Sequence, residues 1–416
     1  TEDQQKAIDE IIRDLQSGKR VNRLLQGDVG SGKTIVAIVL QYLFHLCGYQ
    51  SVMMAPTELL ANQHGESIKR FFADTGLSFA LLKGKMSDAE KEKTMEEIAS
   101  GKVSLVIGTH ALIQSSVRFH RLGLIITDEQ HRFGVEQRKS LYQKSSAPHK
   151  VVMSATPIPR TISHVIYGDL DLSLIKTMPK GRKPVKTYCC RMSYLKKVFQ
   201  SMEKEFLAGR QAFIVCPEIE YDEEPEKART YSLEYVYEKI QGTFLGKYRI
   251  GILHGKMKKE EKDEVMQRFR NRELDLLIAT TVIEVGIDVS NATVILVLSA
   301  ERFGLSTLHQ LRGRVGRGDM QGYCFFATDS ESEKAMQRMK VLTEHQDGFA
   351  IAEEDLRLRG PGDYFGLKQH GMPGFELTNL SDDFEEIELA RGIISTLNEE
   401  QKRFYTKKFK EKTNLD

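Results

Sequence analysis

Short runs of β-branched and other apolar residues alternate along the chain with longer amphipathic stretches. This alternation is typical of parallel β-sheets whose strands are joined by crossover helices. In the first half it predicts strands at Arg23–Gln26, Ser51–Ala55, Phe79–Leu82, Val103–Gly108, Leu122–Asp128 and Val151–Ser154. In the second half it predicts strands at Val185–Cys189, Ala212–Cys216, Ile250–Leu253, Leu274–Thr280, Thr293–Ser299 and Gly322–Ala327.

The two sets of strands are separated by Met178–Pro184, which holds two prolines, one glycine and three cations. Such a segment is typical of a hinge between domains, or of a surface loop within one domain. Beyond about residue 330 the pattern predicts helices at Ser332–Glu344 and Ile351–Arg359, on either side of a turn at Gln346–Gly348. We therefore predict an α/β protein with two sheet domains and a C-terminal helical hairpin with a tail, at residues 1–180, 181–330 and 331–416.

The composition is that of an ordinary globular protein of 416 residues, with 40% apolar and 28% charged residues. No signal peptide is recognisable and no apolar run is long enough to span a bilayer, so we expect no membrane contact. The net charge of +2 gives no evidence for nucleic acid, and a polyanion site would need local clustering of cations. The cysteines show no C-x-x-C pair or metal-ligand spacing, and four of them lie in or beside apolar runs, which predicts buried, reduced thiols and a cytoplasmic location. They are Cys47, Cys189, Cys190, Cys216 and Cys324.

A glycine-rich segment, Gly27-Asp-Val-Gly-Ser-Gly-Lys33-Thr34, follows a predicted strand and leads into a predicted helix. It matches G-x-x-x-x-G-K-[ST], in which glycines let backbone N–H groups approach phosphates and the helix N-terminus favours negative charge. Lys33 would reach the β- and γ-phosphates of ATP, and Thr34 would ligate Mg²⁺. The alternative is a turn that only connects two elements. The candidate nucleotide-binding residues are Gly27, Gly30, Ser31, Gly32, Lys33 and Thr34.

A second apolar strand ends in two carboxylates, Asp128 and Glu129. A carboxylate at a strand tip can hold Mg²⁺, and its neighbour can orient or deprotonate the attacking water. His131 follows, and we expect it near the γ-phosphate or at the domain interface rather than as a packed surface imidazole. Kinases and ABC-type ATPases also have a glycine-rich loop and an acidic residue after a strand. The motifs of the second half are therefore needed to distinguish among P-loop enzymes.

The second half places two arginines, Arg314 and Arg317, three residues apart, a helical spacing that puts both on one face. Guanidinium groups can stabilise charge on a transferring phosphoryl group from a neighbouring domain. The alternative is a solvated basic turn or an RNA-binding patch. Thr280 ends another predicted strand and could contact nucleic-acid phosphates, and Asp288 beyond it could contact the nucleotide.

The order of these motifs resembles that of superfamily 2 helicases, which implies two RecA-like domains with ATP between them. Gln4 is placed like the glutamine that reads adenine, and Gln310 like a residue that senses the nucleotide. Thr57 and Thr109 lie in segments similar to the strand-contacting motifs of the first domain. Ser154-Ala-Thr156 is similar to the motif that couples hydrolysis to domain closure.

Longer segments resemble the RecG family of bacterial fork-remodelling DNA translocases. The resemblance implies an ATP-dependent motor on double-stranded DNA that remodels stalled replication forks and branched DNA, including Holliday junctions, in recombination and repair. A tail element similar to Asp347–Gly362 transmits domain motion in that family, so Arg357, Arg359 and Gln369 would carry the motion to the duplex. The segments that carry the resemblance are Leu24–Thr34, Asp128–Gly134, Ser154–Arg160, Ala300–Leu305 and Asp347–Gly362.

Two departures from the family accompany this resemblance. The family's wedge domain lies upstream of the motor, whereas Thr1 here stands only 26 residues before Gly27, so we expect an upstream wedge domain to be missing from this chain. The tail has Gln369-His-Gly where the family commonly has Gln-Ser-Gly. The partners implied are double-stranded or branched DNA and single-strand-binding protein, with a monomeric motor and no membrane.

Three other functions would require different residues at these motifs. The translocase of the transcription-repair coupling factor usually has a tyrosine before its P-loop Gly-Lys and a second glutamate at position 130, where this chain has Ser31 and Gln130. A DEAD-box RNA helicase would need Asp-Glu-Ala-Asp at Asp128. A non-enzymatic DNA clamp would be expected to lose Lys33, the acidic pair or the arginines, and all of them are present.

Overall fold

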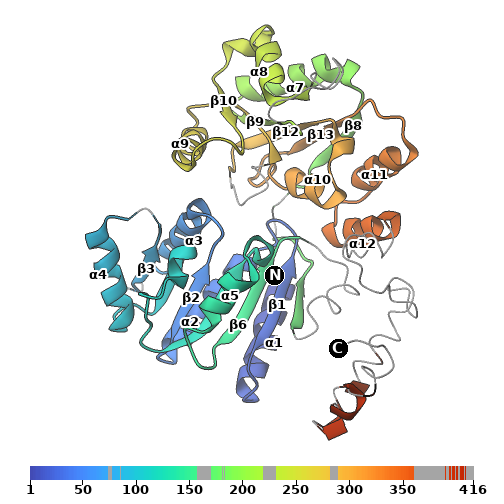
Figure 1. The fold of residues 1–416 in the computed structure, drawn as a ribbon. Helices are drawn as coiled ribbons and strands as arrows, with labels where there is room; N and C mark the ends of the chain where they lie inside the picture. Colours follow the sequence, from blue (N-terminus) through green and yellow to red (C-terminus); the bar gives the residue numbers. More distant parts are fainter. Residues whose placement is uncertain are drawn as a thin grey trace. The chain divides into compact units, whose positions relative to one another are not determined.

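The fold comes from a computed structural model of the chain (Figure 1). It describes residues 1–73, 77–84, 86–156, 170–179, 181, 183–218, 231–281 and 289–359, and within the tail residues 389, 393–394, 396–398, 400–401, 403–406 and 408. Thr1–Pro157 and Asp169–Ala352 form one compact unit, which contains two β-sheets. The remaining residues form a second unit.

The first sheet has seven parallel strands in the order β3-β4-β2-β5-β6-β1-β7. Its central strands β2, β4 and β5 are buried at every position, as expected for a parallel sheet covered on both faces. The strands are β1 Asn22–Gly27, β2 Gln50–Met54, β3 Phe79–Leu82, β4 Leu105–Gly108, β5 Leu122–Asp128, β6 His149–Ser154 and β7 Asp171–Ile175. The accompanying helices are α1 Glu2–Gln16, α2 Lys33–Leu46, α3 Glu58–Phe71, α4 Asp88–Ala99 and α5 Val135–Tyr142.

The second sheet has six parallel strands in the order β10-β11-β9-β12-β13-β8. Its core joins apolar residues of the strands to those of α7 and α8. The strands are β8 Lys186–Cys190, β9 Gln211–Val215, β10 Ile250–Leu253, β11 Leu276–Ala279, β12 Ala292–Leu298 and β13 Tyr323–Ala327. The helices are α7 Leu195–Leu207, α8 Leu233–Gln241, α9 Lys259–Arg270 and α10 Leu305–Arg312.

A helical hairpin follows the second sheet. It comprises α11 Glu333–Glu344 and α12 Gly348–Arg359, and α12 begins three residues earlier than expected. The side chain of Arg338 on α11 donates to the carbonyl oxygens of Phe303 and Glu301, which ties α11 to the segment after β12. The predicted fold class, with two tandem RecA-like sheets and a C-terminal helical hairpin, is confirmed.

All twelve predicted strands are present, and the connection between the two sheets lies where the Met178–Pro184 segment was expected. One strand, β7, was not predicted. It is an edge strand beside β1, held in part by Arg23, whose guanidinium donates to the Ser173 hydroxyl 2.9 Å away. Its polar and apolar residues alternate without the β-branched enrichment that marks the other strands.

The prediction of buried cysteines is wrong for part of the set. All five thiols are free, and Cys216 and Cys324 are buried as expected, but Cys47 and Cys189 are exposed and Cys190 is half-buried. Cys47 caps the end of α2, and Cys189 and Cys190 lie on the edge strand β8, where an apolar neighbourhood in sequence does not ensure burial. Among the residues that the structure describes, no helix combines the length and apolar composition needed to cross a membrane.

Candidate active site

The glycine-rich segment connects β1 to α2, as the sequence predicts. Gly32 lies at φ +87°, and a Cβ on it would stand 2.1 Å from Nε2 of Gln4, so a side chain at this position would strain the backbone and displace the Gln4 amide. The Gln4 amide in turn donates to the carbonyl oxygen of Ser31 over 2.9 Å. The helix α1, which is capped by Thr1, therefore places Gln4 directly against the loop.

Lys33 is buried beneath this loop. Its ammonium donates to the carbonyl oxygens of Gly27 at 2.7 Å and Asp28 at 2.9 Å. Burial lowers the pKa of Lys33, while the carboxylates of Glu129, Asp128 and Asp28 act in the opposite direction. The ammonium is thus a cation removed from water and placed among three carboxylates, where an anionic ligand can interact with it strongly.

The acidic pair lies at the carboxyl end of β5. Asp128 is its last residue, and Glu129 follows in the left-handed region at φ 49° and ψ 56°. Burial raises the pKa of Glu129, and the adjacent charge of Asp128 raises it further. Asp128 is held from α3: Nε2 of His64 lies 2.9 Å from its Oδ2, and both side chains are largely buried.

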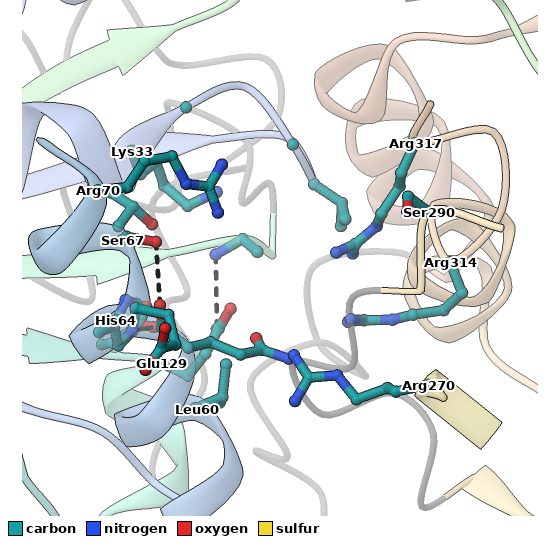
Figure 2. A pocket seen from close by; sticks show the side chains of 18 residues that line it. Lys33, Leu60, His64, Ser67, Arg70, Glu129, Arg270, Ser290, Arg314 and Arg317 are labelled. Atoms are coloured by element: carbon teal, nitrogen blue, oxygen red, sulfur yellow. Dashed lines mark hydrogen bonds and ion pairs between the residues drawn. The ribbon is translucent and has the colours of Figure 1, made fainter. Parts of the chain in front are cut away.

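A cavity of about 560 Å³ brings these groups together with residues of the second half (Figure 2). Lys33 and Glu129 lie on one wall, and Arg314 and Arg317, which follow α10, point into it from the other. Its volume lies within the range of small-molecule sites in proteins. Of the predicted residues, the cavity is lined by Gly30, Gly32, Lys33, Thr34, Asp128, Glu129, Arg314 and Arg317.

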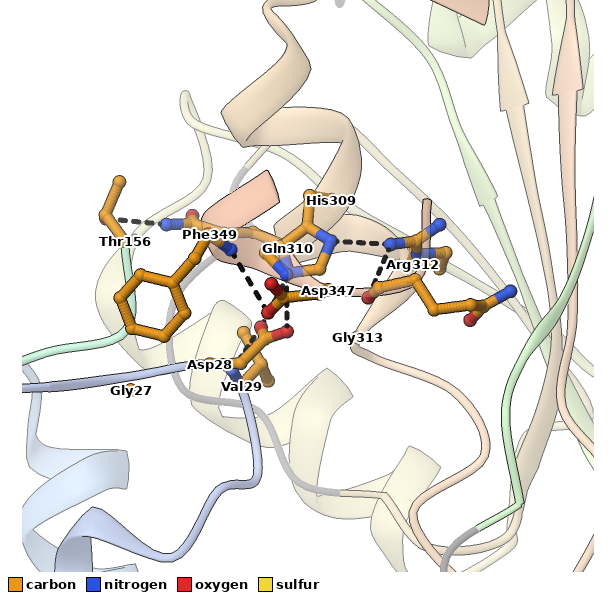
Figure 3. Close-up of polar contacts among 12 residues, drawn as sticks. Gly27, Asp28, Val29, Thr156, His309, Gln310, Arg312, Gly313, Asp347 and Phe349 are labelled. Carbon is orange, nitrogen blue, oxygen red and sulfur yellow. Dashed lines mark hydrogen bonds and ion pairs between the residues drawn. The ribbon is translucent and has the colours of Figure 1, made fainter. Parts of the chain in front are cut away.

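A buried polar network joins the glycine-rich loop to α10 (Figure 3). The Asp28 carboxylate lies 2.6 Å from Nε2 of His309 and accepts a further hydrogen bond from the backbone N–H of Gly348. Arg312 donates to Nδ1 of His309 and to backbone carbonyls between Leu342 and Gln346. Burial would raise the pKa of Asp28, but the hydrogen bond and charge of His309, the backbone N–H of Val29 and the charge of Lys33 together outweigh it, and the pKa is lowered.

Gln310 lies beside this network. Its amide donates to the hydroxyl of Thr156 over 2.8 Å, so the predicted nucleotide-sensing glutamine contacts the segment after β6 that was expected to couple hydrolysis to closure. Asp288, the other predicted nucleotide contact in the second half, lies outside the described residues.

The residues predicted to contact DNA lie on several elements. Thr57 caps α3, its hydroxyl accepting from the backbone N–H of Leu60, whereas Thr109 and Thr280 are buried after β4 and β11. Arg357 is exposed on α12, 3.6 Å from the Glu354 carboxylate. The side chains of His131 and Arg359 and the whole of Gln369 lie outside the described part of the chain.

Several residues near the cavity were missed by the sequence analysis. His64 and Asp28 make the buried contacts described above, and their partners lie 64 and 281 residues away in sequence. No local spacing or periodicity carries information on pairs so far apart. The others are Arg70, Arg270, His309 and Arg312.

Models of three protein families match successive parts of the chain. Residues 1–165 match the DEAD/DEAH box helicase model, and residues 191–319 match the helicase conserved C-terminal domain. Residues 345–410 match the model described as ATP-dependent DNA helicase RecG, domain 3, C-terminal.

Curated relatives match over almost the whole chain. A protein of Staphylococcus aureus strain Mu50 named ATP-dependent DNA helicase RecG is 48% identical over 397 residues, which cover 95% of this chain and 57% of that protein. A protein of the same name from Staphylococcus epidermidis strain RP62A is 47% identical, with 95% of this chain and 58% of the relative covered. The chain thus spans less than two thirds of the length of these relatives.

Solved structures agree. A structure of RecG bound to a three-way DNA junction superposes with a TM-score of 0.78 at 43% identity, covering 93% of this chain and 50% of that one. Yeast Dbp5 bound to RNA and ADP–BeF₃ has a TM-score of 0.56 at 16% identity, which shows a shared fold alone. The sequence match over 95% of the chain and the tail model together show that this chain belongs to the RecG family of proteins named ATP-dependent DNA helicases.

Proposed function

We propose that the chain is an ATP-driven motor that translocates on double-stranded and branched DNA. The observation that carries this proposal is the single cavity in which Lys33 and Glu129 of the first half meet Arg314 and Arg317 of the second. A nucleotide bound there touches both halves, so its binding and release can change how they engage each other.

The phosphates of ATP would bind where the glycine-rich loop meets the start of α2. Backbone N–H groups and the helix dipole favour negative charge at this point. Lys33 would exchange its bonds to the Gly27 and Asp28 carbonyls for phosphate oxygens. Arg314 and Arg317 would stabilise the charge that develops on the γ-phosphoryl group. Gln4 would read the base from its position against Ser31.

The residues present also fit Mg²⁺. Thr34 and Asp128 offer a hydroxyl and a carboxylate on the wall of one cavity, and hard oxygen ligands are those that Mg²⁺ prefers. Within the described part of the chain no three His, Cys, Asp or Glu side chains form a metal site alone, which suits an ion that takes its other ligands from phosphate and water. When bound, the ion would neutralise charge on the phosphates.

Glu129 is the residue placed to act on water. It sits beside Asp128, and its carboxylate accepts a 3.4 Å hydrogen bond from the backbone N–H of Ala155. Its raised pKa makes it a stronger base than an ordinary glutamate once it is ionised. We assign to Glu129 the orientation and deprotonation of the water that attacks the γ-phosphate.

The work of the cycle would be movement along the duplex. We propose that the two predicted sheet domains, residues 1–180 and 181–330, alternate between closed and open states. The region 331–416 would pass this motion to DNA. Arg357 would contact the duplex, with Thr57 at the start of α3 contacting it from the first sheet. In the full-length relatives' context this motor would drive fork regression and Holliday junction processing. The names of the relatives and the junction-bound RecG structure support DNA as the substrate.

The test is ATP hydrolysis measured with no DNA, with single-stranded DNA, with plain duplex and with a model fork. We expect duplex or fork to stimulate hydrolysis, and the matched variant Lys33→Ala to abolish it. Stimulation by single-stranded DNA alone would contradict a duplex motor. Hydrolysis no higher than in Lys33→Ala would contradict the assignment of an ATPase to this chain.

A further inference from the structure

The helix α3 connects two parts of the first half that the proposed function uses separately. It begins after Thr57, which caps it, and seven residues later it presents His64 to Asp128. Seven residues of α-helix span about 10 Å, two turns of a stiff rod. The end of the helix nearest the proposed DNA contact is therefore rigidly connected to the carboxylate at the tip of β5.

The contact between His64 and Asp128 is buried and short. The two side chains are 7% and 11% exposed, and Nε2 lies 2.9 Å from Oδ2. A buried imidazole that binds through Nε2 fixes the orientation of the carboxylate plane, because one oxygen is committed to the ring. The helix also packs closely at the next residue, because a Cβ on Gly65 would lie 3.3 Å from the Phe79 ring.

The cavity side of α3 lies beside this pair. Leu60, His64 and Ser67 recur at helical spacing and all line the cavity that holds Lys33 and Glu129 (Figure 2). A histidine used only to stabilise the core would have no reason to face that cavity while bonded to its strand-tip carboxylate. Groups that hold a ligand carboxylate from behind commonly change metal affinity by about 10- to 100-fold when removed.

We propose that His64 is a positioning residue: it holds Asp128 in the orientation that binds Mg²⁺, and through α3 it lets duplex contact at Thr57 change the affinity for the metal. This inference rests on the proposed function, since it takes Asp128 as the metal-binding carboxylate and Thr57 as a DNA contact. It explains how DNA binding on the first half can stimulate hydrolysis without touching the nucleotide.

The test compares three variants of the full chain. His64→Met keeps a side chain of similar size and removes the N–H donor, whereas His64→Gln keeps a donor at the reach of Nε2. The matched control is His45→Ala, which removes another histidine hydrogen bond of the first half, the 2.6 Å contact with Ser104. Thermal unfolding of each variant establishes that it folds.

The readout is the affinity for Mn²⁺, used as a substitute for Mg²⁺, in the presence of ATP. Mn²⁺ binding is followed by electron paramagnetic resonance. We expect the dissociation constant to rise about 10-fold or more in His64→Met, to return towards wild type in His64→Gln, and to stay unchanged in His45→Ala. An unchanged constant in a folded His64→Met protein overturns the inference.

Repeating the titration with saturating duplex tests the link to DNA. We expect duplex to tighten Mn²⁺ binding in the wild-type chain and to have a smaller effect in His64→Met. An equal effect of duplex in both proteins overturns the link through α3. A failure of the proposed function looks different, because a chain that ignores DNA in the hydrolysis assay still shows whether His64 sets the metal affinity.

Discussion

The two halves of the molecule share one backbone plan and differ at the ends of their strands. Numbered from the first strand of each half, both sheets follow the order 3-4-2-5-6-1, and the first adds β7 beyond that. Each begins its second strand with a buried glutamine. The amide of Gln50 donates to the carbonyls of Ile98 and Val103, and that of Gln211 to the carbonyls of Phe269 and Leu274.

The comparison separates architecture from chemistry most clearly after the fifth strand of each half. Glu129 and Ser299 both lie at φ 49°, each before a short 3-10 helix. A left-handed glutamate beside a catalytic cavity invites an explanation by functional strain. Ser299 has the same conformation after β12, which ends in Leu298 where β5 ends in Asp128. The left-handed turn is therefore a feature of the shared fold and does not depend on the carboxylates.

The first strands differ as well. In the first half the glycine-rich loop connects β1 to α2, whereas in the second half Arg191 and the short 3-10 helix Met192–Tyr194 connect β8 to α7. Between β8 and α7, a stretch that the structure describes throughout, the second half therefore has no counterpart of the glycine-rich loop. Among the side chains that it brings to the cavity are the cations of Arg314 and Arg317.

The largest effect should follow from removing those cations. Arg314→Ala or Arg317→Ala should lower kcat for ATP hydrolysis by about 10³-fold, the range of arginine fingers, with little change in nucleotide binding. Stopped-flow hydrolysis beside binding of a fluorescent nucleotide separates the two quantities. Arg249→Ala, which breaks an exposed ion pair with Asp275 in the same half, is the control. If nucleotide affinity fell by the same factor as kcat, the two arginines would not act only in the transition state.

A second experiment copies one half into the other. Glu129→Ser places the residue of the second half on the same turn, and we expect hydrolysis to fall by about 10²-fold or more because the base is lost. The fold should persist, since Ser299 already occupies this conformation. Ser299→Ala is the control and should hydrolyse ATP as the wild type does. A Glu129→Ser protein with wild-type turnover would remove the carboxylate from the mechanism.

The sequence predicts the shared plan better than the differences within it. Buried strands such as β5 and β12 are continuous apolar runs, and the glycine-rich loop has a local signature, so both could be predicted from their own residues. The edge strand β7 has no such signature. The bond between Asp28 and His309 depends on how two sheets meet, which no pattern within either segment encodes.

The paired glutamines test whether the two halves are stabilised alike. Gln50→Met and Gln211→Met should each lower the free energy of unfolding by about 2–3 kcal/mol, because two buried carbonyls lose their donor. Gln41 on α2 offers a matched control: it is fully buried, and its amide has no hydrogen-bond partner among the residues that the structure describes. Gln41→Met should therefore be neutral or stabilising. Urea denaturation measures the free energy of unfolding of all three variants. A lower free energy of unfolding in Gln41→Met, with no change in Gln50→Met and Gln211→Met, would contradict the expected role of the two hydrogen-bonded glutamines.

The smallest effect concerns the contact that joins the two halves at the glycine-rich loop. Asp28→Asn keeps the shape of the side chain and removes its charge, so unfolding should cost about 1 kcal/mol less. Because the pKa of Asp28 is held below its ordinary value of 3.8, its contribution is complete above that value and is lost as the pH falls through the lowered pKa. The difference between wild type and Asp28→Asn in urea denaturation should then stay constant from neutral pH down to about pH 5. A difference that already closes near neutral pH would mean that the ionisation of Asp28 does not control the contact.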